Sequence, residues 1–516
     1  MFYIKEINLA MGKMAYYLGV DIGTTCTKAV LFGNKGQVIS MHHAGYPLYS
    51  PTPNVAEQDP DEILVAVKEA IRVAIQKSKI DVNTLRLVSF SAAMHSVIAI
   101  DKNGKPLTNC ITWADTRATD WSEKIKNEMN GHEIHPMSPL CKITWLQHEK
   151  PEIFQKTFKF ISMKEYVFHD FFGRYLVDHS IASATGMFNL KNNDWDETAL
   201  EVAGISSDQF SELVPTTYFL DGLKEEIVEE IGIPSNIPFV IGANDGVLSN
   251  LGVNAIDPGV VAVTIGTSGA IRTVTDHPIT DPKGRIFCYV LTDKHWVVGG
   301  PVNNGGMTFR WVRDELAASE VETAKRLGID AYDVLTRIAS NVKPGSDGLL
   351  FHPYLAGERA PLWNANARGS FFGLGLHHKK EHMIRAVLEG VIFNLYTVFI
   401  ALQEVIGIPN KIQATGGFAR SELWRQMMAD IFNQEVSVPE SFESSCLGAI
   451  VLGMYALGEI DDFSIISEWV GSTHIHNPIE ENVNIYIELI PIFIRISRLL
   501  EQEYQDITKF QEKWVK

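Results

Sequence analysis

Two distant segments of the chain share one pattern of apolar and polar positions. Residues 18–32 read LGVDIGTTCTKAVLF, and residues 261–274 read VAVTIGTSGAIRTV. Each consists of an apolar run rich in β-branched residues, then Ile-Gly-Thr and a second hydroxyl residue, then another apolar run, which predicts a β-hairpin. The two turns lie about half the chain apart. The pattern therefore predicts two similarly built halves, each opening with such a hairpin.

Further along the chain, helical and strand periodicities alternate. Apolar residues at helical spacing follow Asp59-Pro60 and predict a helix over 61–76. The remaining expected strands are 85–91, 97–100, 238–241 and 412–415, and the remaining expected helices start at 247 or cover 381–402, 421–432 and the last 40 or so residues. This alternation predicts an α/β fold.

The length of 516 residues is too great for one compact core, so we expect two domains. Asp257-Pro258-Gly259 predicts a turn between them. We expect a first domain over 15–256, a second over 257–516, and a disordered extension over 1–14.

Composition limits the partners. A formal net charge of −17 argues against nucleic acid and anionic membranes. No apolar run reaches the roughly 20 residues that span a bilayer. Five scattered cysteines without a C-x-x-C pair indicate reduced thiols and a cytoplasmic protein. A small-molecule substrate is the partner that remains.

The two turns have the chemistry of phosphate binding. Small residues let backbone N–H groups approach a phosphate, and hydroxyl groups add donors. A single such turn is commonly only a hairpin, but a matching pair favours phosphate. No GxxxxGK[ST] motif is present, and two hairpin turns facing a shared cleft are the arrangement of the actin-like ATPases. The ATP-binding candidates are Gly23, Thr24, Thr25 and the cation Lys28 in the first half, and Gly266, Thr267 and Ser268 in the second.

Three other polar positions follow predicted strands. Asp21, just before the first turn, is a candidate ligand for Mg²⁺, with a turn-stabilising role as the alternative. Gly416, Gly417 and Arg420 open a helix and are candidates for nucleotide contact, or a simple helix entry. Asp245 is the candidate general base that accepts the proton of an alcohol; a helix cap is its alternative.

An alcohol acceptor needs directional polar contacts and an apolar wall. Met94 and His95 follow one predicted strand, and Asp115 and Arg117 follow Trp113 after another apolar segment. Asp115 and Arg117 are candidates for hydroxyl groups, and Arg117 for a carboxylate. His95 and Trp113 each have a place in the core as the alternative.

Several segments together resemble the FGGY family of carbohydrate kinases, over about residues 17–458. The most specific is GSFFGLGLHHKKEHMIRAVLEG (369–390), supported by MSPLCKITWLQHE (137–149), DIGTT, GTSG, ATGGFARS and the segment with Asp245. The resemblance implies two ribonuclease H-like domains around a catalytic cleft, with MgATP as phosphoryl donor to a terminal hydroxyl. Because kinases of this family are often dimers, it also implies a homodimer.

The resemblance assigns roles position by position. Asp245 matches the catalytic base, and Met94, His95, Asp115 and Asn244 match acceptor positions. Thr24, Thr25, Gly266, Thr267, Gly305, Gly417 and Arg420 match or neighbour nucleotide positions. The role of Arg117 toward a carboxylate is our own inference.

Within the family, SFSAAMHSVIAID, ITWADTRA and VIGANDGVLSNLGVNAI read most like members that phosphorylate gluconate, giving 6-phosphogluconate. Xylulose phosphorylation is the alternative, and a non-catalytic sensor of ATP or sugar is the non-enzymatic one. One departure bears on the acceptor: 130–134 runs straight into His135, where the resemblance leads us to expect a longer segment with Thr-Gly-x-Pro.

Overall fold

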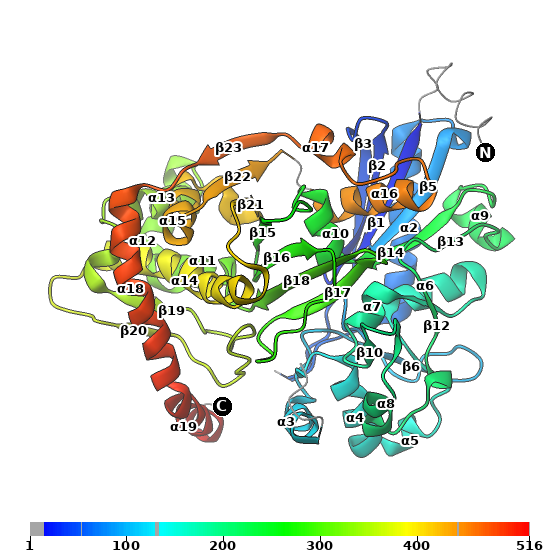
Figure 1. Cartoon of the computed structure of the whole chain (residues 1–516), viewed down its shortest axis with the longest axis horizontal. Helices are drawn as coiled ribbons and strands as arrows, with labels where there is room; N and C mark the ends of the chain where they lie inside the picture. The colour runs from blue at the N-terminus through cyan, green and yellow to red at the C-terminus, as the bar shows by residue number, and fades with distance from the viewer. Residues whose placement is uncertain (1–14, 53, 129–133, 441–442, 515–516) are drawn as a thin grey trace.

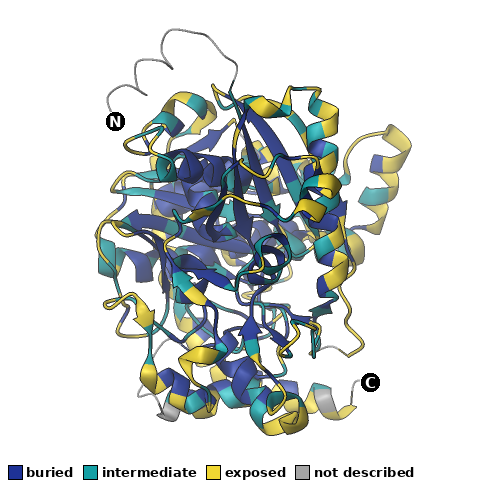
Figure 2. Cartoon of the chain, turned by 90° about the vertical axis from the view of Figure 1, so that its right-hand side faces the viewer, coloured by how far each residue is buried: buried dark blue, intermediate teal, exposed yellow. Residues whose placement is uncertain are grey.

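The computed structural model describes residues 15–52, 54–128, 134–440 and 443–514. Two mixed sheets form its centre, with helices around them (Figure 1). The strands of both sheets are largely buried, and the exposed residues lie mainly on the surrounding helices and loops (Figure 2). The extension expected at 1–14 lies outside the described residues, as do residues 129–133 of the segment before His135.

The first sheet has the order β13-β14-β5-β1-β2-β3. Its predicted hairpin is present: β1 and β2 pair antiparallel on either side of the Gly-Thr turn. β3 continues the antiparallel meander, whereas β5 is parallel to β1 and β14 is parallel to β5. The strands are β1 (Tyr16–Ile22), β2 (Cys26–Gly33), β3 (Val38–Gly45), β5 (Leu85–Ala92), β13 (Phe219–Leu220) and β14 (Phe239–Asn244).

The second sheet repeats this plan in the order β17-β18-β16-β15-β21-β22-β23. The predicted hairpin β15–β16 is antiparallel, β18 extends it, and β21 and β22 run parallel to β15. In both sheets the hairpin is extended by a third antiparallel strand on one side and by two parallel strands on the other, which confirms the predicted pair of ribonuclease H-like domains. The strands are β15 (Val260–Ile265), β16 (Gly269–Thr275), β17 (Phe287–Thr292), β18 (His295–Val302), β21 (Lys411–Thr415), β22 (Glu435–Pro439) and β23 (Ser472–His476).

Helices cover both faces of the first sheet. One face packs against α2 (Pro60–Ser78), α6 (Met163–Phe172) and α9 (Glu225–Ile231). The predicted helix α2 begins where Asp59 accepts hydrogen bonds from two backbone N–H groups. The opposite face packs against α10 (Asp245–Gly252) and α16 (Ser444–Ala456).

Helix α16 therefore belongs to the second half by sequence and to the first sheet by packing (Figure 1). Its residues from Cys446 to Met454 are all buried. It approaches α10 closely because Gly448 has no side chain: a Cβ there would lie 2.0 Å from the carbonyl oxygen of Leu248. The same apolar cluster includes residues of β17 and β18, so it joins the two halves.

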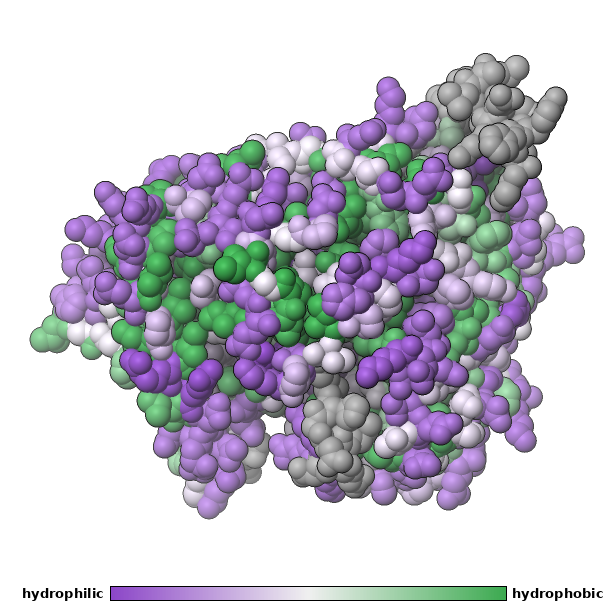
Figure 3. Space-filling view, viewed as in Figure 1, coloured by the Kyte–Doolittle hydropathy of each residue, from purple (hydrophilic) through white to green (hydrophobic). Residues whose placement is uncertain are grey.

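The second sheet packs against α14 (Lys380–Ile406), α15 (Glu422–Phe432) and α18 (Glu480–Leu499), all close to their predicted positions. Among the described residues, α14 is the one helix long and apolar enough to cross a membrane, and 78% of its apolar window is buried inside the protein. That burial is typical of a core helix. Polar side chains cover much of the face in Figure 3, with smaller apolar groups between them.

A smaller unit with its own apolar core is inserted between β5 and β14. It contains β6 (Ile98–Ile100), β7 (Cys110–Ile111), α3 (Thr119–Glu128), α4 (Pro139–Glu149), β8 (Lys159–Ile161) and α8 (Glu197–Ala203). The other elements that bear on the site are β4 (Glu57–Gln58), α7 (His179–Ser183), α11 (Gly306–Trp311), β19 (Leu350–His352), β20 (Ser370–Phe372), a 3₁₀ turn (Gly417–Arg420) and the C-terminal α19 (Glu501–Trp514).

One expected boundary is wrong. We expected a loop over 242–246 and a helix from Val247, but β14 continues to Asn244 and α10 begins at Asp245. The reason is the cap: the Asn244 side-chain oxygen accepts a hydrogen bond from the Val247 N–H at 2.9 Å. Asp245 is thus held on a strand-to-helix junction.

Candidate active site

The carboxyl ends of three parallel strands bring the acidic candidates together. Asp21 of β1 is in register with Ser91 of β5, and Ala92 is in register with Asn244 of β14. The Ser91 hydroxyl donates to Asp21 Oδ1 at 2.7 Å, and the Ser445 hydroxyl, from α16, donates to Oδ2 at 2.9 Å. Both oxygens of Asp21 are therefore oriented by residues from opposite halves of the sequence.

Asp245 begins α10 beside this edge and is half-buried. Its Oδ1 accepts a hydrogen bond from the Gly246 N–H at 2.7 Å. Burial, and then the negative charge of Asp21, raise the pKa of Asp245 to about 6, against the opposing effect of Arg272. A carboxylate with a pKa near neutrality is suited to accept a proton from an alcohol.

The residues that precede and support Asp245 have hydrogen-bond or ion-pair partners within the protein. Asn244 caps α10, and its Nδ2 donates to Ser180 Oγ at 3.0 Å. The buried ammonium of Lys164 pairs with Asp178 at 2.6 Å and donates to the Ala243 carbonyl at 3.2 Å. Asn244 thus supports Asp245, and its contact with an acceptor stays a prediction. Lys164 was missed at the level of sequence, because its partners come from separate elements.

The first Gly-Thr turn is tied to the acceptor segment. Trp113 Nε1 donates to Thr24 Oγ1 at 2.8 Å, and Gln58 Nε2 donates to the Thr24 carbonyl at 2.7 Å. Gly23, Thr24, Met94 and Trp113 line one narrow pocket of about 20 Å³. This is about the space of one water molecule. Thr25 is exposed.

The second Gly-Thr turn lies beside the glycines that follow β21, Gly416 and Gly417. Parallel pairing places Thr264 beside Thr415, with 2.8 Å between their hydroxyl oxygens. The turn at Gly266–Ser268 and the glycines at 416 and 417 therefore share one edge. Gly416 has a φ of 98°, and a Cβ there would lie 2.3 Å from the Ile265 carbonyl oxygen, so only glycine fits.

Helix α11 begins against this second turn. Gly306 N–H donates to the Gly266 carbonyl at 2.7 Å, and Met307 N–H donates to the Thr267 carbonyl at 3.0 Å, which places Gly305 beside the turn as well. Gly417 and Arg420 are exposed on the 3₁₀ turn that follows β21. Lys28 pairs instead with Glu443 at 3.0 Å. Nucleotide contacts of all these residues stay predictions.

His95 is buried at the interface between the halves. Its Nδ1 donates to the Ala184 carbonyl at 2.7 Å, and its Nε2 lies 3.4 Å from the Tyr289 hydroxyl. Burial, with the positive charges nearby, holds the pKa of His95 well below its usual range, so the ring is neutral. Nε2 is then an acceptor for Tyr289. The neighbouring Met94 reaches α10, where its Cε would lie 3.2 Å from a Cβ on Gly246.

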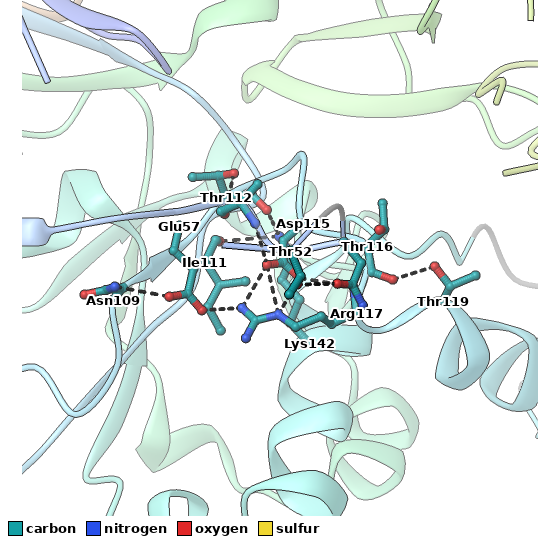
Figure 4. A network of polar contacts seen from close by, with 12 residues as sticks. Thr52, Glu57, Asn109, Ile111, Thr112, Asp115, Thr116, Arg117, Thr119 and Lys142 are labelled. Carbon is teal, nitrogen blue, oxygen red and sulfur yellow. Dashed lines mark hydrogen bonds and ion pairs between the residues drawn. The ribbon is translucent and has the colours of Figure 1, made fainter. Parts of the chain in front are cut away.

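Asp115 and Arg117 bind each other (Figure 4). Arg117 Nε lies 3.0 Å from both Asp115 oxygens, Nη2 lies 2.8 Å from Oδ2, and the same Nη2 contacts Glu57. The guanidinium also lies 4.5 Å from the Trp145 ring centroid. Both side chains are committed to one network at the base of the acceptor segment. Their contacts with an acceptor stay predictions.

Lys142 forms hydrogen bonds to the backbone next to Asp115 (Figure 4). Its buried ammonium donates to the carbonyls of His95 at 2.6 Å and Thr112 at 2.7 Å. Burial lowers the pKa of Lys142 to about 7, with Asp115 opposing the shift. It therefore joins the His95 segment to the Asp115 segment.

The donor set fits Mg²⁺ that arrives with a nucleotide. Among the described residues there is no group of three or more His, Cys, Asp or Glu side chains that could hold a metal. Mg²⁺ commonly keeps waters and binds one or two carboxylates together with substrate phosphates. Asp21, whose negative charge raises the pKa of the nearby Asp245, is the carboxylate that could hold such an ion, and this role stays a prediction.

Comparison with known proteins agrees with this architecture. Models of the N-terminal and C-terminal domains of the FGGY family of carbohydrate kinases match residues 16–252 and 261–457. The chain is 62% identical to gluconokinase of Bacillus subtilis (96% of this chain, 98% of that protein) and 28% identical to xylulose kinase of Staphylococcus epidermidis (95% and 98%). The chain belongs to the FGGY family of carbohydrate kinases.

Two solved structures from Lactobacillus acidophilus have the same fold. One is a gluconate kinase and the other a ligand-bound xylulose kinase. Each has a TM-score of 0.90, is 38% identical, and covers 96% of this chain and 100% of its own.

Proposed function

We propose that this protein is an ATP-dependent gluconokinase that transfers the γ-phosphoryl group of MgATP to the C6 hydroxyl of D-gluconate. The observation that carries the transfer reaction is Asp245, a carboxylate with a pKa near 6 at the edge where the first Gly-Thr turn also lies. The identity of 62% with a gluconokinase over nearly the whole chain supports gluconate as the acceptor.

The residues divide the chemistry as follows. Asp245 accepts the proton of the C6 hydroxyl while that oxygen attacks the γ-phosphorus in line, and the bond from the γ-phosphorus to the bridging oxygen breaks to release ADP. Backbone N–H groups of the two turns hold the phosphate oxygens. Mg²⁺, when bound near Asp21, supplies neutralising positive charge.

A coupled assay of ADP release tests the proposal across gluconate, xylulose, glycerol, ribulose and fuculose. We expect the highest kcat/KM with gluconate. ADP release with xylulose but none with gluconate would assign the alternative activity. No ADP release with any acceptor, together with binding of ATP or sugar, would assign the non-catalytic sensor.

The proposal extends to location and assembly. The charge of −17 and five free cysteines support a cytoplasmic protein that acts on a small molecule and not on nucleic acid or membranes. Light scattering coupled to size exclusion tests the homodimer, and omission of Mg²⁺ in the ADP assay tests the metal.

A further inference from the structure

An arginine of the second half extends into the acceptor region of the first. Arg359 lies in the segment between β19 and β20, and its guanidinium carbon is 5.1 Å from the centroid of the Trp113 ring. Its Nη1 lies 3.8 Å from Met137 Sδ. The residue therefore contacts the segment that carries the predicted acceptor residues Asp115 and Arg117, and also the start of the family signature at Met137.

The backbone beside Arg359 is rigidly held. The carboxylate of Glu358 is buried, and its Oε1 accepts hydrogen bonds from the N–H groups of Asn303 at 2.6 Å and Arg359 at 2.7 Å. Its Oε2 accepts from the side-chain amides of Asn304 at 2.9 Å and Asn394 at 2.8 Å. Four donors thus use the Glu358 oxygens and fix the segment that presents Arg359.

Among the described residues, the guanidinium of Arg359 has no carboxylate partner at salt-bridge distance. Its Nη2 donates to the Val302 carbonyl at 2.9 Å, a neutral acceptor. Its Nε is buried and has no hydrogen-bond partner among the described residues. Arg359 as a whole is half-buried, but a buried nitrogen with an unused hydrogen is costly unless an acceptor on a ligand completes it. Burial lowers the pKa of Arg359 to about 10, even with Glu358 nearby.

Two more buried nitrogens without hydrogen-bond partners lie in the same region. One is His135 Nδ1, on a ring that stacks on Trp363 at 5.0 Å and meets His95 edge-on at 5.1 Å. The other is Arg272 Nε, which would lie 3.2 Å from a Cβ on Gly246. Burial and the charge of Arg359 lower the pKa of His135 to about 3, so its ring adds a polar nitrogen without adding charge.

Arg272 and Arg359 lie at different places relative to Asp245, where the hydroxyl of the acceptor would react. Arg272 adjoins the start of α10 and lowers the pKa of Asp245. Arg272 also lowers the pKa of Arg359, and Arg359 lowers the pKa of His95 and of His135. In a six-carbon sugar acid the carboxylate is at the opposite end from the C6 hydroxyl. With that hydroxyl at Asp245, the carboxylate extends away from α10, toward Arg359 and His135.

We propose that Arg359 binds the carboxylate of the acceptor and so determines the preference for a sugar acid over a neutral sugar. This inference rests on the proposed gluconokinase function and names the residue that makes the substrate choice. Arg117, the candidate from sequence, already has its guanidinium on Asp115, Glu57 and Trp145.

The test compares gluconate with D-glucitol, in which a hydroxymethyl group replaces the carboxylate. For Arg359→Gln we expect kcat/KM for gluconate to fall about 100-fold, as for loss of a charge-assisted hydrogen bond, mainly through KM. The value for glucitol and the KM of ATP should change less than about threefold. Arg359→Lys should recover part of the gluconate activity, because it restores the charge.

An equal fall for both acceptors, or a rise in the KM of ATP alone, would overturn the proposal by assigning Arg359 to the fold or to the phosphates. Wild-type enzyme that is inactive on gluconate would instead refute the proposed function. Should glucitol turnover be too slow to measure, calorimetric titration of gluconate in the presence of a non-hydrolysable ATP analogue decides. We expect at least tenfold weaker binding to Arg359→Gln, and an unchanged Kd overturns the proposal.

Arg117→Gln is the matched comparison. It releases Asp115 from its ion pair, so we expect lower activity toward gluconate and glucitol alike. A loss confined to gluconate in Arg117→Gln, with none in Arg359→Gln, would assign the carboxylate to Arg117 and overturn the proposal.

Discussion

The two Gly-Thr turns occupy the same place in two similarly built sheets, yet the two halves of the chain contribute side chains of opposite charge to the region of the first turn. The first lies beside Asp21 and Asp245, and the residues that extend from the second half into the same region are Arg272 and Arg359. The backbone of the hairpin is repeated, whereas the first half contributes the proposed base and the second half contributes the arginines. If the proposals hold, the first half carries out proton transfer and the second half recognises the charge of the acceptor.

The largest expected effect is the loss of turnover on substitution of Asp245. Asp245→Asn keeps the shape of the side chain and removes the proton acceptor, so we expect turnover to fall by about 10²–10⁴-fold. ATP binding should survive, since no predicted nucleotide residue is altered. ADP release and calorimetric titration of ATP measure the two properties, and near-normal turnover would remove Asp245 from the role of base.

In the second half, the sensitive feature is the backbone at Gly416, which follows β21 and lies beside the second Gly-Thr turn. Gly416→Ala forces a Cβ to within 2.3 Å of the Ile265 carbonyl oxygen at a positive φ, so we expect Tm to fall by roughly 5–10 °C. Gly417→Ala is the control, because a Cβ at that position would meet no atom within 4 Å. Equal Tm values for the two variants in thermal melts would contradict the strain argument.

The interaction of the two carboxylates should appear in the pH profile. Asp245 must be ionised to accept a proton, so kcat/KM should rise with pH through a midpoint near 6. Asp21→Asn removes a negative charge that raises this pKa, so the midpoint should move to lower pH. Ser445→Ala leaves the Asp21 charge in place and should leave the midpoint unchanged; a shift only in Ser445→Ala would contradict the assignment.

The smallest expected effect concerns the pair Lys28–Glu443. Its side chains are 38% and 19% exposed, so a double-mutant cycle of Lys28→Met and Glu443→Gln should give a coupling energy below about 1 kcal/mol. Urea unfolding measures it. A rise in the KM of ATP for Lys28→Met alone would place the ammonium on a phosphate and sharpen the contrast between the turns.

The hairpins could be predicted from sequence because their signal is local. Apolar alternation and the Gly-Thr turns are complete within about fifteen residues, whereas the strand order of each sheet depends on pairing between distant segments and was not predicted. The secondary structure around Asp245 was less predictable, because it depends on a helix cap. The Asn244 side chain accepts a hydrogen bond from the Val247 N–H, so α10 begins at Asp245 and there is no loop between β14 and the helix. Treating Asn-Asp as a helix start would have found it.

The cationic side of the site could not be predicted in the same way. Arg272 lies in an apolar strand and Arg359 in a loop after Glu358, and neither has a local pattern that indicates a ligand. Their importance comes from contacts with Gly246, Trp113 and Met137, which are distant from them in the chain. Only the folded arrangement of both halves shows that they meet.

Helix α16 has a consequence for how the protein is made. It covers the apolar face of a sheet whose strands β1 and β5 are complete by residue 92, yet the helix ends at residue 456. At ~5–20 residues per second, synthesis leaves that face without its cover for tens of seconds. The first half therefore emerges from the ribosome as an unfinished unit, and its protection from aggregation depends on the chain that is still to come.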